Sequence, residues 1–310
     1  MKIIGHATVV TLGENHQVIN DGAVAYDDHK IHAVGTTEEL KQRFPKAKVR
    51  NVHGRLVMPG IVNTHMHLYS TFARGISLKD APPTNFVQIL ERLWWRLDKA
   101  LTKEDLYLTA MIPLLDAVRN GVTTLIDHHA SPNCIGGSLS VLRDAFRKCG
   151  LRGNLCYEIT DRDGIERCDA GFEENANFIR GLKLDSESDI TAMIGMHASF
   201  TLSDTSLERA AELSKALQTG IHIHVAEDKA DNEDAAVTEA VKDNEEPQVR
   251  GLDKEGNQES HNADTEADDA QFFPAYFNGK LRHKRSKDEK RQCRYNGGNG
   301  LRRRISEVVR

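Results

Sequence analysis

The stretch MPGIVNTHMH, residues 58–67, joins a short apolar run to two histidines and decides the expected fold. Residues two apart on a strand point to the same side, so His65 and His67 would converge beyond the end of a buried strand. The stretch GIHIHVAE, residues 220–227, repeats this arrangement and adds a carboxylate. Three imidazoles and a nearby carboxylate can hold a metal ion, its water and a proton acceptor. The two motifs predict a metal-dependent hydrolase; the alternative is two strands with core histidines.

Length and composition narrow the class of protein. A chain of 310 residues has room for one large α/β barrel or two ordinary domains. A net charge of -5 argues against general nucleic-acid binding. No segment approaches the ~20 apolar residues that span a bilayer, and the first residues lack the apolar stretch of a signal peptide. The five cysteines form no C-x-x-C pair and predict no disulfide framework. We therefore expect a cytoplasmic protein.

The pattern of apolar residues divides the chain into three regions. Residues 1–55 show short alternating runs separated by turn residues, which predicts a small antiparallel, β-rich subdomain of β-sandwich type. A helix is expected to begin there with Thr36 or Thr37 as its cap. In residues 56–234 strands alternate with helices, which predicts parallel βαβ units with right-handed crossovers. The fold class is therefore α/β, a (β/α)8 TIM barrel with its chemistry at the carboxyl ends of the strands.

Five βα units can be placed along this middle region. The first expected strand ends at His67, and the other four cover residues 122–127, 151–160, 190–197 and 220–225. The expected helices cover residues 86–101, 102–120, 138–148, 172–182 and 203–217. A closed barrel needs eight such units, so we expect one that is truncated after the fifth.

Residues 235–310 differ in composition from the rest. Residues 243–269 are rich in Glu, Asp, Asn and Gln, and residues 280–310 are dense in Lys and Arg. Such segments cannot bury enough apolar surface to offset chain entropy, so this region is predicted to be a polar, disordered tail. The change of composition cuts a predicted helix rather than a linker, which suggests a shifted reading frame near residues 232–241.

Several unlinked motifs resemble the amidohydrolase superfamily. The resemblance rests first on MPGIVNTHMH and on HVAE, residues 224–227. The stretch GMHASFT, residues 195–201, is similar to the fourth-strand substrate motif of the cytosine/guanine deaminase and chlorohydrolase branch. LWWRLD, residues 93–98, and DHHASP, residues 127–132, are similar to motifs of SsnA-like aminohydrolases. The resemblance covers about residues 1–234 and implies a barrel of the metal-dependent hydrolase type.

The resemblance also implies roles for individual residues. His65, His67 and His224 match metal ligands, Glu227 matches the acid/base glutamate, and His197 matches a histidine that contacts the substrate. One divalent metal is implied, with Zn favoured over Fe. The fourth strand carries no lysine, which favours a single metal over the bridged pair of other superfamily members. The family's sixth-strand histidine and eighth-strand aspartate have no matching position.

Three further histidines lie at expected strand ends. His128 and His129 follow Asp127, and they are either a pair that binds substrate or a polar strand end that faces solvent. His222 shares a side of its strand with His224 but is expected one layer deeper, as a core or supporting histidine. We include His128 and His129 among the expected substrate-binding residues.

The expected reaction follows from these groups. Zn lowers the pKa of bound water from ~15.7 to ~7, and Glu227 would accept its proton and return it to a departing amine. We expect hydrolysis of a carbon–nitrogen bond other than a peptide bond, as in deamination of a purine or related heterocycle. One alternative is a guanine- or chlorotriazine-type hydrolase, and another is a noncatalytic, truncated or frameshifted product. The expected partner is a small heterocyclic substrate, without nucleic acid or membrane, and a homodimer is allowed.

Overall fold

The computed structural model describes residues 1–28, 30–185 and 189–227. The tail predicted for residues 235–310 therefore lies outside the described residues. The chain divides into two units, one of which comprises Met1–Ile76 and Leu101–His224, and the other of which includes the described residues 77–100 and 225–227. None of the described helices is long and apolar enough to cross a membrane.

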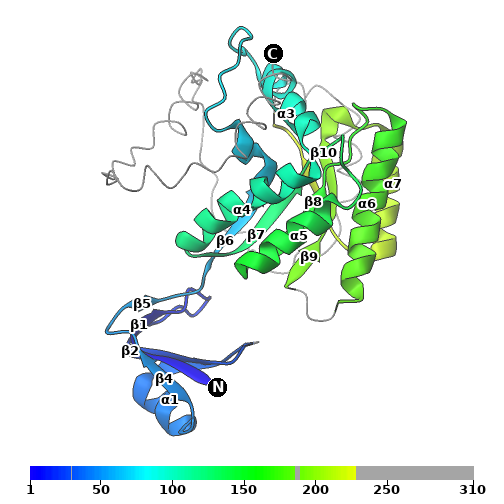
Figure 1. Cartoon of the computed structure of the whole chain (residues 1–310). Coiled ribbons are helices and arrows are strands. Elements are labelled where there is room, and N and C mark those ends of the chain that lie inside the picture. The colour runs from blue at the N-terminus through cyan, green and yellow to red at the C-terminus, as the bar shows by residue number, and fades with distance from the viewer. Residues whose placement is uncertain (29, 186–188, 228–310) are drawn as a thin grey trace, which may run out of the picture. The chain divides into compact units, whose positions relative to one another are not determined.

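The first residues form a five-stranded sheet in the order β3-β2-β1-β4, with β5 also pairing with β1 (Figure 1). The pairs β1–β2 and β2–β3 are antiparallel, as predicted, whereas β4 and β5 run parallel to β1. Helix α1 begins after Thr36, whose side chain forms a capping box with Glu39, and it packs Leu40 against the sheet. The bounds are β1 Lys2–Val10, β2 Val18–Tyr26, β3 Ile31–Thr36, α1 Thr37–Arg43, β4 Lys48–Asn51 and β5 Leu56–Val57.

A parallel sheet follows in the order of the sequence. Strands β6, β7, β8 and β9 pair in that order, and β10 pairs with β11. A bridge between Ile159 and Met196 connects the end of β8 to β10. The expected parallel strands are confirmed, each beside its neighbour in sequence. The bounds are β6 Ile61–Met66, β7 Val122–His129, β8 Arg152–Tyr157, β9 Ile190–Ala192, β10 Ile194–Ala198 and β11 Ile221–His224.

The fourth expected strand is divided in two. At Met193 the backbone N–H donates to the carbonyl of Leu155, and at Ile194 it donates to the carbonyl of Gly220. The chain thus changes from pairing with β8 to pairing with β11 within one residue. The single strand predicted for residues 190–197 was wrong in this detail, because the apolar pattern does not report which neighbour each residue pairs with.

Four helices, α4 to α7, pack against this sheet. One apolar cluster lies between the sheet and helices α4 and α5, and a second lies between α6, α7 and β10. The predicted starts at Thr102 and Ser203 are confirmed, since both side chains cap their helices. Helix α6 begins earlier than predicted and includes Gly171, where an added Cβ would lie 3.3 Å from the side chains of Tyr157 and Ile159. Close packing of helix on sheet thus outweighs the low helix propensity of glycine. The bounds are α4 Lys103–Arg119, α5 Ser138–Cys149, α6 Ile165–Lys183 and α7 Asp204–Leu217, with short 3-10 helices at Leu68–Ala73 and Ser199–Thr201.

The described part of the second unit is a helical segment, α2 Phe86–Ile89, a π-helical turn Leu90–Trp94 and α3 Trp95–Ala100. Asn85 caps its first turn, and an ion pair of 2.6 Å joins Arg96 Nη1 to Asp80 Oδ2. A single regular helix over residues 86–101 was predicted, and the π-helical turn interrupts it.

One glycine sets how closely β8 and β10 approach. A Cβ added at Gly195 would lie 2.4 Å from the carbonyl oxygen of Tyr157, which is backbone and cannot rotate away. We expect Gly195→Ala to lower the free energy of unfolding by about 1–3 kcal/mol, the usual cost of overpacking, as measured by urea denaturation.

The matched control is Gly181→Ala in α6, where an added Cβ meets nothing within 4 Å. Helix propensity favours alanine there by up to ~1 kcal/mol, so this variant should be as stable as the parent or more stable. An equal decrease in the free energy of unfolding in the two variants would contradict the close approach of β8 and β10 at Gly195.

Candidate metal centre

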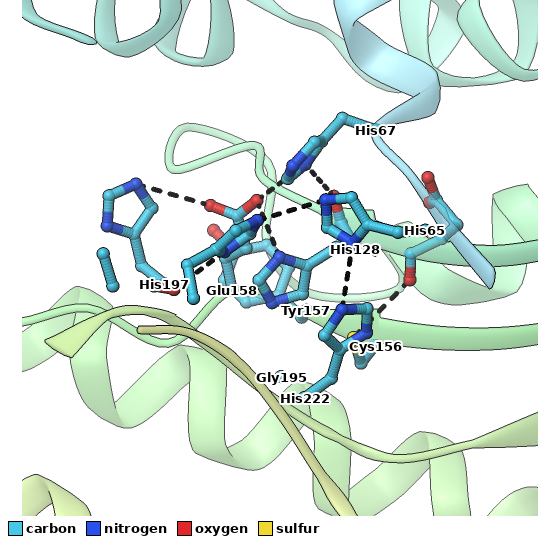
Figure 2. A network of polar contacts seen from close by, with 12 residues as sticks. His65, His67, His128, Cys156, Tyr157, Glu158, Gly195, His197 and His222 are labelled. Atoms are coloured by element: carbon cyan, nitrogen blue, oxygen red, sulfur yellow. Dashed lines mark hydrogen bonds and ion pairs between the residues drawn. The ribbon is translucent and has the colours of Figure 1, made fainter. Parts of the chain in front are cut away.

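The carboxyl ends of the parallel strands carry a cluster of imidazoles around one carboxylate (Figure 2). Parallel strands bring their carboxyl ends to the same edge of a sheet, so side chains distant in sequence meet there. Strand β8 is extended by one residue, because the N–H of Glu158 donates to the carbonyl of His129 at 2.7 Å. The cluster, by strand, is His65 and His67 at β6, His128 at β7, Glu158 after β8, His197 in β10, and His222 and His224 in β11.

The structure brings together the three histidines that were expected to bind metal. One nitrogen from each of His65, His67 and His224 lies within 4.8 Å of the other two. The Nε2 atoms of His65 and His224 are 3.2 Å apart. The rings of His67 and His224 are stacked, with their centroids separated by 5.2 Å. Residues almost 160 positions apart therefore present their nitrogens to a common point.

Hydrogen bonds select the protonated nitrogen of two of these rings. His67 Nδ1 donates to the carbonyl of His128 at 2.7 Å, and His224 Nδ1 donates to the carbonyl of His197 at 3.0 Å. A neutral imidazole carries one N–H, so Nε2 of each ring has a lone pair. Metal-ligating histidines almost always donate their other ring N–H to a carbonyl, carboxylate or water in this way.

The third ring completes a donor set that fits a metal ion. His65 Nδ1 lies 3.0 Å from His222 Nε2, and a bond donated there leaves the His65 Nε2 lone pair facing that of His224. Two lone pairs 3.2 Å apart repel unless a cation lies between them. Zn–N bonds of about 2.0–2.1 Å in a tetrahedron separate neighbouring nitrogens by about 3.3–3.4 Å. The observed separation therefore suits a tetrahedral ion.

The charge state of His65 also suits metal binding. Burial, together with the neighbouring His67 and His224, lowers the pKa of His65 to about 4. The ring is therefore neutral near pH 7, which is the form that coordinates a metal.

Glu158 lies at the centre of the cluster and was not predicted from the sequence. Its side chain is 2% exposed, and its Oε1 lies 3.0 Å from His67 Nδ1 and 3.4 Å from His128 Nδ1. Burial alone would raise the pKa of Glu158, but His128, His67 and His197 together lower it well below its usual range. A sequence signal was available, because Glu158 is the one carboxylate in the strand-like run LRGNLCYEIT, residues 151–160, and buried carboxylates need partners.

The histidine pair at the end of β7 is fully buried, so the alternative of a polar strand end facing solvent was wrong. His128 lies in the cluster and stacks on His222, with ring centroids 4.4 Å apart. His129 is held instead through Nε2 by the hydroxyl of Ser131 at 3.0 Å. Substrate contact by either residue stays a prediction. His222 supports His65, in keeping with its expected place behind the ligands.

His197 is held by its own motif. The hydroxyl of Thr201 donates to the carbonyl of Ala198 at 2.7 Å and lies 2.9 Å from His197 Nδ1. That hydroxyl can therefore accept the Nδ1–H, which makes Nε2 the acceptor nitrogen. Burial above all lowers the pKa of His197 to about 4, so the ring stays neutral.

Glu227, the expected acid/base residue, follows β11 and is exposed. Between it and His224 the backbone turns at Ala226, which has a φ of 59°. A positive φ is uncommon for a residue other than glycine. Its catalytic role stays a prediction.

Comparison with known proteins agrees with this site. Residues 56–252 match the amidohydrolase family, and residues 22–47 match the imidazolonepropionase-like composite domain of bacteria. A 5-methylthioadenosine/S-adenosylhomocysteine deaminase of Moorella thermoacetica is 30% identical over 234 residues, which are 75% of this chain and 51% of that protein. The chain thus spans about half the length of this relative.

Solved structures share the fold at low sequence identity. A guanine deaminase of C. acetobutylicum with bound guanine matches with a TM-score of 0.63 and 16% identity, over 79% of this chain and 57% of that one. An atrazine chlorohydrolase of Arthrobacter aurescens TC1 complexed with zinc matches with a TM-score of 0.57 and 21% identity, over 73% and 53%. The family match spans well over half of the sequence and includes both histidine motifs. The chain belongs to the amidohydrolase family.

Proposed function

We propose that this protein is a metal-dependent hydrolase that acts on carbon–nitrogen bonds other than peptide bonds and deaminates a purine or related heterocycle. The observation that carries the proposal is the convergence of His65, His67 and His224, with Nδ1 of His67 and of His224 bonded to backbone carbonyls, so that Nε2 is the nitrogen each neutral ring would offer to a metal. The relative from M. thermoacetica is a deaminase of purine nucleoside derivatives by its name, which supports this substrate class.

The residues of the site would have three roles in the proposed reaction: holding the metal, transferring a proton and binding the substrate. His65, His67 and His224 would hold one divalent ion, with Zn favoured, and the bound ion lowers the pKa of a water molecule. Glu227 would accept the proton of that water and pass it to the departing amine. His197, with Nε2 as acceptor, would receive a hydrogen bond from a ring N–H or the amino group of the substrate.

The finer organisation of the chain is part of the same proposal. We infer that residues 1–55 form a segment of a β-sandwich composite domain, which the match over residues 22–47 supports. Residues 56–234 would form a partial barrel of five βα units, and residues 235–310 an additional polar tail. The noncatalytic alternative is less favoured, because the strands that are described already assemble the metal-binding histidines.

The setting of the protein is also inferred. We propose a cytoplasmic location, because the cysteines of the described residues are all free, as is usual in a reducing compartment. A homodimer stays a prediction.

The test combines metal analysis with an ammonia assay on the intact chain. We expect one equivalent of Zn or Fe by elemental analysis, and ammonia release from a panel of adenosine derivatives and guanine. Chloride release from a chlorotriazine would favour the alternative of a chlorotriazine-type hydrolase of the same branch. Metal binding without turnover on any substrate would support the noncatalytic alternative, and absence of metal would contradict the proposal itself.

A further inference from the structure

The carboxylate of Glu158 is surrounded by side chains that bear on the metal centre (Figure 2). It is buried, and a carboxylate removed from water persists only where partners compensate the lost hydration. Those partners are imidazoles, since Oε1 lies 3.0 Å from His67 Nδ1 and 3.4 Å from His128 Nδ1. The carboxylate is therefore stabilised by the imidazoles of His67 and His128.

The proton on His67 Nδ1 is donated to a backbone carbonyl, with the Glu158 carboxylate close by as an ion-pair partner. His67 Nδ1 lies 2.7 Å from the carbonyl oxygen of His128 and 3.0 Å from Glu158 Oε1. A carbonyl oxygen cannot donate, so the hydrogen of the bond to His128 must belong to Nδ1, whereas Glu158 Oε1 itself accepts no hydrogen bond within the described residues. The lone pair is then on Nε2, on the other side of the ring.

Two further rings, those of His128 and His222, lie between Glu158 Oε1 and His65. Neither ring nitrogen of His128 makes a hydrogen bond within the described part of the chain, although the ring is fully buried. Its Nδ1 faces Glu158 Oε1, and its ring stacks on His222. His222 in turn contacts His65 Nδ1 at 3.0 Å. The negative charge of Glu158 thus lies next to His128, the ring that stacks on the partner of His65, as well as next to His67.

We propose that Glu158 is a positioning residue of the metal centre, which holds the orientation of His67 by charge attraction at Nδ1 and supplies negative charge behind the ligands. The inference deepens the proposed function and rests on it. Carboxylate–histidine–metal arrangements raise ligand basicity and hold the ring in place. Loss of the carboxylate should therefore weaken metal binding without removing a ligand.

The same three groups do not form a second cation site. Atoms of His67, His128 and Glu158 lie within 4.8 Å of one another, which is close enough for an ion. However, His67 Nδ1 already donates to the carbonyl of His128 and has no lone pair to offer. Its Nε2 belongs to the group formed with His65 and His224. The carboxylate thus acts on the first site.

The test compares Co²⁺ binding by the parent and by Glu158→Gln. Both full chains are first stripped of metal with a chelator, and binding is monitored by visible absorption. We expect the dissociation constant for Co²⁺ to rise about 10–100-fold, the usual cost of losing a partner behind a ligand. The absorption bands of bound Co²⁺ should also change, because the field at the metal depends on the orientation and basicity of His67.

The control is Glu174→Gln, a second buried carboxylate in the same unit. Glu174 accepts from the backbone N–H of Gly137 at 2.7 Å and of Leu139 at 2.9 Å, at the start of α5. This variant should lose thermal stability but bind Co²⁺ as the parent does. Equal affinity of the parent and Glu158→Gln would overturn the positioning role and leave the metal site standing. No Co²⁺ binding by the parent would overturn both.

A second measurement needs no folded variant at this position. Long-range ¹H–¹⁵N spectra of the metal-free parent report which nitrogen of each imidazole carries the proton, and His67→Asn identifies the signals of His67. We expect the Nδ1–H form for His67. The Nε2–H form would overturn the inference even if Glu158→Gln did not fold.

Discussion

Replacing His224 with alanine is expected to abolish stoichiometric metal binding. The variant loses one of three converging nitrogens, and the two that remain both come from β6. Partners behind a ligand already change metal affinity about 10–100-fold, so loss of a ligand itself should exceed ~100-fold. The metal content of the purified variant, measured by elemental analysis after dialysis, should fall from one equivalent to near zero.

His32→Ala provides the control for loss of an imidazole. His32 lies in the first sheet, where its Nε2 is 2.5 Å from Asp27 Oδ2, and it is not among the converging histidines. Its removal should leave metal content unchanged. If His224→Ala retained a full equivalent, the metal would have to be held elsewhere, and the assignment of His65, His67 and His224 as ligands would fail.

Replacing Glu227 with glutamine is expected to lower kcat about 10²–10⁴-fold, the usual contribution of a general acid/base. The amide cannot accept the proton of the attacking water, although its size is nearly unchanged. Because Glu227 is not proposed as a ligand, metal content should stay at one equivalent. The measurement is ammonia release at saturating substrate, together with metal analysis of the same sample.

Glu104→Gln is the matched control for this change of charge. Glu104 lies in the first turn of α4 and is exposed, so its replacement should leave kcat within about twofold of the parent, as for a surface position away from the site. A Glu227→Gln variant with full activity would require another residue to move the proton. Loss of metal together with activity would instead assign Glu227 to the metal centre.

The sequence was sufficient to predict the parallel strands and the histidines that meet at their ends. Both follow from local patterns, since an apolar run ending in H-x-H places two imidazoles on one side of a strand. The alternation of strands with helices then requires those ends to share one edge of the sheet. The helix starts at Thr102 and Ser203 were equally local, because capping depends on the next three residues.

What the sequence did not reveal depends on contacts between distant residues. The role of Glu158 depends on its contacts with His67 and His128, which are contributed by other strands. The break at Met193 marks a change of partner from β8 to β11, which no single segment of the sequence records. The early start of α6 reflects the fit of Gly171 against β8 and its extension. Pairwise packing of this kind exists only once the chain has folded.

The apolar clusters that hold the sheet to α4–α7 lie along the strands and helices, with Leu125, Leu155 and Ile194 among their members, whereas the candidate metal ligands lie at the carboxyl ends of the strands. Cohesion of the scaffold and chemistry at its rim therefore draw on separate sets of side chains. Substitutions among the candidate ligands are therefore expected to leave these apolar clusters intact.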